Sequence, residues 1–268
     1  MRLDVDLRMD YALAPDDPAL LAITAAPVQG QTVLESTLDI EDATLRWIGG
    51  ESGIGRRVWA ITTKPRLKLR YRARLDVTRP EVALSALDAT PWDLLAGDVL
   101  TFLRPSRFCP SDQLVTFARN RFGHLEGGAK IAAIGEWTAA ALAYVPGSSD
   151  ALTTAVDTFL TREGVCRDYA HLVCALARAA GIPARYTTGY GPDVDPPDFH
   201  AVAEVWLGGG WHIVDATGMT TPSGLAIIGS GRDAGDVPFM ETERWASMIC
   251  QRVTVTADVQ PQPAPSIG

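Results

Sequence analysis

The chain has 268 residues, which is enough for one large domain or two of ordinary size, and we favour two. Apolar residues make up 47% of the sequence and the formal net charge is −8, as is typical of a soluble acidic globular protein. Nucleic-acid-binding proteins usually carry a basic surplus, so we expect no nucleic-acid partner. No apolar run approaches the roughly 20 residues of a membrane-spanning helix, and we expect no membrane association.

The N-terminus alternates polar and apolar residues, which predicts a strand and argues against a signal peptide. The four cysteines are scattered and form no C-x-x-C pair. Together these features favour reduced thiols and a cytoplasmic location.

Residues 1–80 are predicted to form a β-rich N-terminal domain. Segments of alternating polarity, such as Arg57–Thr62 and Lys68–Leu75, are separated by Gly, Pro and Asp, a pattern typical of antiparallel strands in a sandwich-like module. The arginines between Arg66 and Arg74 could form a nucleic-acid patch. Because they stand at alternate positions of one strand, we favour a solvated strand face.

Residues 81–110 are proline-containing and are predicted to be a linker with a short helix or two. A second domain is expected over residues 111–259, followed by a disordered tail at residues 260–268. Within this domain Ser111 is interpreted as the N-cap of a first helix, and residues 131–142 as a second. Ser149 or Asp150 is interpreted as the cap of a third helix that ends at Gly164. Residues 251–259 are predicted to be an edge strand.

A buried helix is predicted to begin at Cys166 and to stop at Gly181. The unpaired N–H groups and the positive end of the dipole at a helix start stabilise a thiolate, and Arg167 adds positive charge. Cys166 is therefore a candidate nucleophile. The other thiols are interpreted as small buried side chains: Cys109, Cys174 and Cys250.

Two strands, His200–Leu207 and Trp211–Thr217, flank a glycine-rich turn and predict a hairpin. If Leu207 pairs with Gly210 around a two-residue turn, His200 and Asp215 lie on one face within side-chain reach. A three-residue turn would place them on opposite faces.

A cysteine at a helix start, a histidine opening a strand and an aspartate on the partner strand are the parts of a Cys-His-Asp triad. Glu204, on the same strand face as His200, is an alternative orienting carboxylate. Cys166, His171 and Cys174 could instead bind zinc. Cys166 and Cys174 are eight residues apart on one helix, a rise of about 12 Å that argues against this site, and we expect no metal and no cofactor.

Four segments resemble the core of the transglutaminase-like superfamily of papain-type cysteine enzymes: residues 164–172, 181–186, 199–205 and 211–217. The resemblance runs from about Ser111 to Thr217, and the β-rich start resembles the N-terminal domain of bacterial members. It implies an α+β fold, in which an antiparallel β-sandwich-like domain precedes a papain-like core of helices packed on an antiparallel sheet. Val202 stands where many members have tryptophan, and Ala216 where many have proline.

The resemblance implies catalytic roles for Cys166, His200 and Asp215 in acyl transfer through a thioester. The Cys166 N–H is a plausible oxyanion donor, and Trp137 and Tyr144 are candidates for the second. We expect hydrolysis of peptide or amide bonds, with a peptide or protein as the substrate. The alternatives are a transglutaminase that joins glutamine and lysine side chains, and a non-enzymatic peptide-binding scaffold on the same fold.

Overall fold

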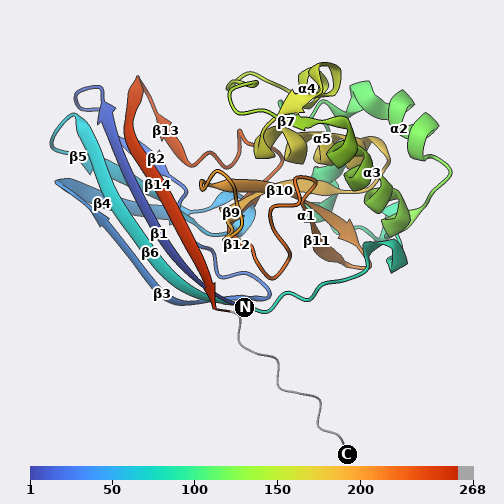
Figure 1. The fold of residues 1–268 in the computed structure, drawn as a ribbon, viewed down its shortest axis with the longest axis horizontal. Helices are drawn as coiled ribbons and strands as arrows, with labels where there is room; N and C mark the ends of the chain where they lie inside the picture. Colours follow the sequence, from blue (N-terminus) through green and yellow to red (C-terminus); the bar gives the residue numbers. More distant parts are fainter. Residues whose placement is uncertain (259–268) are drawn as a thin grey trace, which may run out of the picture.

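The structure is a computed structural model that describes residues 1–258. Figure 1 shows two parts side by side: a part built of strands alone, and a part in which helices gather over a sheet. The α+β fold expected from the sequence is therefore confirmed. The predicted tail at residues 260–268 lies outside the described residues.

The strand-only part is a sandwich-like pair of antiparallel sheets. One sheet has the strand order β14-β1-β6-β3 and the other β13-β2-β5-β4. Apolar side chains of both sheets share one buried core. The strands are β1 (Arg2–Leu13), β2 (Ala19–Leu21), β3 (Gln31–Ile40), β4 (Ala43–Gly49), β5 (Arg56–Thr62), β6 (Arg66–Val77), β13 (Met240–Thr242) and β14 (Ala246–Asp258).

The last two strands correct the domain boundary drawn from the sequence. The predicted edge strand near residues 251–259 exists, but β14 pairs with β1 and β13 pairs with β2. Both strands were assigned to the second domain at residues 111–259, and they belong to the N-terminal sheets. Alternation predicts a strand but does not identify its partner, which here lies more than two hundred positions away in the chain.

The arginines of β6 lie on the outer face of this domain. Arg66 pairs with Asp10 at 2.6 Å, Arg74 pairs with Asp4 at 2.8 Å, and Arg70 pairs with Asp6. Apolar residues at the intervening positions of β6 are buried. The interpretation as a solvated strand face is confirmed, because these arginines are exposed or partly exposed and pair with carboxylates of the neighbouring strands β1 and β3.

The second part is a four-stranded antiparallel sheet of order β11-β10-β9-β12, with helices packed against it. Residues 81–110 contain short helical turns, including α1 (Gly97–Leu100), as predicted, but the expected linker packs against the second part: Cys109 is buried in its core and Phe102 packs on Trp211. None of the helices within residues 1–258 has the length and apolarity required to cross a bilayer. The elements are α2 (Val115–Phe122), α3 (Gly127–Ala141), β7 (Ala143–Tyr144), α4 (Ala155–Thr161), β8 (Glu163–Gly164), α5 (Cys166–Ala179), β9 (Ala184–Tyr190), β10 (His200–Leu207), β11 (Gly210–Val214) and β12 (Ala226–Gly231).

The hairpin of β10 and β11 has the two-residue turn. Leu207 pairs with Gly210, and both turn residues have positive φ, +55° at Gly208 and +81° at Gly209. These angles are those of a type I′ turn, which glycine adopts without strain. The register that places His200 and Asp215 on one face is confirmed.

Two helix starts differ from the sequence prediction. Ser111 opens a short 3₁₀ turn that precedes α2, and its side chain caps nothing. The third helix, α4, is capped by Thr154, whose hydroxyl accepts from the Asp157 N–H. The Asp150 carboxylate instead accepts the N–H groups of Leu152 and Thr153. These hydrogen bonds form a turn, and the helix begins only after it, at Ala155.

Candidate active site

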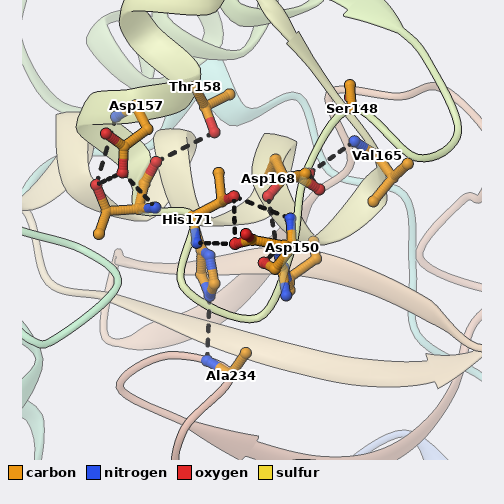
Figure 2. Close-up of polar contacts among 12 residues, drawn as sticks. Ser148, Asp150, Asp157, Thr158, Val165, Asp168, His171 and Ala234 are labelled. Atoms are coloured by element: carbon orange, nitrogen blue, oxygen red, sulfur yellow. Dashed lines mark hydrogen bonds and ion pairs between the residues drawn. The ribbon is translucent and has the colours of Figure 1, made fainter.

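Cys166 is the first residue of α5 and is partly exposed. The preceding turn is held by Asp168, a fully buried carboxylate that accepts the Val165 N–H at 2.8 Å and the Ser149 hydroxyl at 2.6 Å. Figure 2 shows Asp168 pointing at the Val165 N–H. A side chain at Gly164 would bring its Cβ within 2.7 Å of the Asp168 Cβ, so glycine is required there. These contacts fix the backbone that presents the thiol.

His200 and Asp215 are in direct contact. The fully buried His200 ring places Nε2 2.8 Å from Asp215 Oδ2. The carboxylate is itself held, because Oδ1 accepts the N–H and hydroxyl of Thr217, and Oδ2 accepts those of Thr220. His200 Nδ1 is buried and has no hydrogen-bond partner among the described residues, which leaves this nitrogen for the Cys166 thiol.

Charge at the site favours a protonated imidazole. Burial lowers the pKa of His200, but the hydrogen bond to Asp215 and the neighbouring Cys166 side chain, together with their charges, raise it to about 9. Burial raises the pKa of Asp215, but the hydrogen bond and charge of His200, with the Thr217 and Thr220 hydroxyls, bring it below its usual value. An imidazolium between a carboxylate and a thiol is the arrangement that supports a thiolate nucleophile.

The structure brings Tyr144, and not Trp137, to the thiol. The parallel pair β7–β8 sets Tyr144 opposite Gly164, two residues before Cys166. Burial and the neighbouring Cys166 thiolate raise the pKa of Tyr144 to about 12, so its hydroxyl stays protonated and able to donate. Trp137 packs in an aromatic group with Phe117 and Phe159.

His171 is structural, and the zinc alternative has no geometric support. Its Nε2 accepts the Ala234 N–H at 3.1 Å, as Figure 2 shows. Its ring stacks on Phe108 and packs at a tilt against Tyr186. Cys174 is fully buried in the core, and the described residues contain no group of three His, Cys, Asp or Glu side chains that could hold a metal ion.

The other three cysteines differ in burial. Cys109 and Cys174 are fully buried, as predicted, but Cys250 is exposed, so the prediction of a buried side chain is wrong for it. Cys250 lies in the edge strand β14, opposite Asp10 of β1, in a stretch where consecutive residues are exposed.

Glu204 is not the orienting carboxylate. It is buried and accepts hydrogen bonds from Arg185 at 2.8 Å and from Thr187 at 2.6 Å. These partners satisfy the hydrogen-bonding capacity of the Glu204 carboxylate inside the sheet. Of the two candidate carboxylates, Asp215 is the one that contacts His200.

Several supporting residues were not identified from the sequence. Thr217 could have been found, because an aspartate side chain commonly forms a turn by accepting the N–H of the residue two positions later. Thr220 and Ser149 have no such signal, since their partners depend on how loops fold. Arg167 was expected near the thiol, but its guanidinium contacts the Asp150 carbonyl and Asp168.

Comparison with known proteins gives a consistent result. Residues 117–216 match the transglutaminase-like superfamily. A crystal structure of a candidate cysteine protease from Cytophaga hutchinsonii is 34% identical, with a TM-score of 0.91, and the match covers 97% of this chain and 93% of that one.

Curated relatives match over shorter regions. An uncharacterised protein of Mycobacterium leprae is 29% identical over 145 residues, covering 50% of this chain and 52% of the relative. A protein-glutamine gamma-glutamyltransferase of Pseudomonas aeruginosa is 36% identical over 103 residues, covering 31% of this chain and 15% of the relative. The chain thus spans about half, or less, of the length of these curated relatives.

Proposed function

The chain belongs to the transglutaminase-like superfamily, and from this premise we propose that it is a cysteine-dependent acyl-transfer enzyme that hydrolyses peptide or amide bonds. The observation that carries the proposal is the His200 imidazole, which binds Asp215 through Nε2 and leaves Nδ1 for Cys166 at the start of α5. This order of groups is that of a thiolate–imidazolium pair with an orienting carboxylate.

In the first step the Cys166 thiolate attacks the amide carbonyl carbon, forming a carbon–sulfur bond. His200 Nδ1 gives its proton to the amine nitrogen as the carbon–nitrogen bond breaks, and Asp215 keeps the ring oriented. The proposed donors to the oxyanion are the Cys166 N–H, at the helix start, and the hydroxyl of the neighbouring Tyr144.

In the second step water attacks the thioester and releases an acid. His200 Nδ1 accepts the proton of that water, and the thiolate leaves to regenerate the enzyme. A primary amine in place of water would give a transglutaminase. The name of the Pseudomonas aeruginosa relative favours this second candidate, which uses the same residues.

The test incubates the protein with a glutamine-containing protein and a labelled primary amine, and measures peptide cleavage and label incorporation together. We expect cleavage by wild type and by Cys250→Ala, which changes an exposed thiol outside the site, and none by Cys166→Ala. Label incorporation above that of Cys166→Ala would overturn the pure hydrolase. Activity retained in Cys166→Ala would overturn cysteine catalysis altogether.

A further inference from the structure

The residue directly before His200 belongs to the core of the other domain. Phe199 is buried among the apolar side chains of the N-terminal sandwich. Its ring stacks on Phe239, with 3.8 Å between centroids and 19° between planes, and packs against Tyr190 at 5.4 Å. The backbone that leads into the catalytic strand is thus anchored outside the catalytic sheet.

Both aromatic neighbours are tied to the N-terminal domain. The carbonyl of Phe239 accepts the Ala22 N–H at 3.0 Å, just after β2. The Tyr190 hydroxyl donates to the Ile23 carbonyl at 2.6 Å, and its ring stacks with Tyr71 of β6. Contacts from both N-terminal sheets therefore converge on Phe199.

A hydrogen-bonded chain reaches the same backbone from the edge strand. Gln251 of β14 donates through Nε2 to Asp198 Oδ1 at 2.7 Å, and its Oε1 accepts the Tyr11 hydroxyl at 2.8 Å. The same Asp198 oxygen accepts the Phe199 N–H at 2.8 Å. Asp198 and Phe199 are thus both held by strands of the N-terminal domain.

We propose that Phe199 is a positioning residue for His200, and that the N-terminal domain, through Phe239 and Gln251, supplies the support that aligns the imidazole with Cys166. This inference rests on the proposed function, in which His200 is the base. His200 is the first residue of β10 and pairs with a neighbouring strand on one side only, opposite Gly189. The position of its backbone, and so of its ring, therefore depends on the residues that precede it. Catalytic groups must be held within about 0.5 Å of their productive geometry.

The consequence is that the β-rich domain forms part of the active site and is more than an attached module. Loosening the Phe199 stack should move the imidazole away from the thiol without removing a catalytic group. The thiolate would then lose its imidazolium partner and form only near the free-cysteine pKa of about 8.5.

The test measures the rate of Cys166 alkylation by iodoacetamide between pH 5 and 9 in Phe239→Leu, which keeps the bulk of the side chain and removes the ring. We expect the rate at pH 6 to fall by about tenfold, since small misplacements at a reacting centre have large effects on rate. The control is Val5→Ala, in the same buried core but on β1, where we expect the wild-type profile. Neither variant alters the titratable groups around the thiol and imidazole, which include Asp168, Asp198, Asp215, Tyr144, Tyr186 and Arg167.

Gln251→Ala is the second variant, because it removes one exposed and one partly buried hydrogen bond and leaves the apolar core unchanged. We expect a decrease of about twofold in the same direction, as for the loss of one hydrogen bond. Wild-type profiles in both variants would overturn the proposal, as would an equal change in Val5→Ala. A wild-type protein without reactivity below pH 8 would overturn the proposed function itself, and the inference with it.

Discussion

The two halves of the candidate site are supported in different ways. On the nucleophile side, Cys166 is positioned by near neighbours in sequence: β7, Ser149, Gly164 and Asp168. On the base side, the backbone before His200 is positioned by residues far away in sequence, among them Phe239 and Gln251. A nucleophile can thus be presented by one local turn, whereas the base depends on the packing of two domains.

The largest effect is expected on the nucleophile side, for Tyr144→Phe. Removing an oxyanion donor while keeping the ring should lower kcat by about 10²- to 10³-fold, with little change in KM. The matched control is Trp137→Phe, in the nearby aromatic group, which should leave kcat within about twofold of wild type. Steady-state kinetics on a peptide substrate measures both. An unchanged kcat in Tyr144→Phe would show that another group stabilises the oxyanion.

The next effect concerns the base side and depends on pH. Because the folded pKa of His200 is raised to about 9, its contribution to stability is complete below the unfolded pKa of about 6.5 and is lost as pH rises through 9. The pKa of Asp215 is lowered, so its contribution is present above an unfolded value of about 3.9 and is lost at lower pH. The pair should therefore stabilise the fold most between these two unfolded values.

Asp215→Asn tests this window. We expect the free energy of unfolding to decrease by up to about 3 kcal/mol at pH 5 to 6, where the variant loses a buried hydrogen bond to a charged partner, and by much less above pH 9, where the imidazole is neutral. Urea denaturation at pH 5, 7 and 9.5 measures the difference. The control is Asp193→Asn, on an exposed loop, where no pH-dependent difference is expected. A difference that stays constant from pH 5 to 9.5 would contradict the assignment of the pair.

The smallest effect tests the local support of Cys166. Asp168→Ala leaves the Val165 N–H and the Ser149 hydroxyl without their partner, which should reduce the free energy of unfolding by about 2 kcal/mol. Asp157→Ala removes the exposed carboxylate that accepts the N–H and hydroxyl of the cap residue Thr154, and as the comparison it should cost about 1 kcal/mol. Denaturant unfolding with equal m-values measures both. A smaller loss in Asp168→Ala than in Asp157→Ala would contradict the role given to the buried carboxylate.

Sequence reasoning succeeded where the signal was local. A helix start at Cys166 follows from apolar periodicity. The glycine-rich turn predicts a hairpin, and of the two turn lengths left open the structure has the two-residue turn, which places His200 beside Asp215. Both features depend on residues that are close together in the chain. The contact between His200 and Asp215 was predictable for this reason.

The remaining features depend on tertiary packing. No local pattern links β14 to β1 or places Phe199 on Phe239, because the apolar face of a strand or ring fits many partners. Thr154 was missed as a helix cap because Ser149 and Asp150 offer the same side-chain chemistry a few residues earlier. The cytoplasmic location and the nature of the substrate stay predictions.

The most direct test of the central claim compares two thiols of the same chain. Cys250 is exposed and Cys166 only partly so, which means that simple access would make Cys250 react first. We predict that limited iodoacetamide at pH 6, followed by peptide mass spectrometry, labels Cys166 ahead of Cys250, and that His200→Ala removes this preference. Labelling of Cys250 first in wild type, with Cys166 reacting only as pH approaches about 8.5, would contradict a catalytic thiolate and favour a non-enzymatic scaffold.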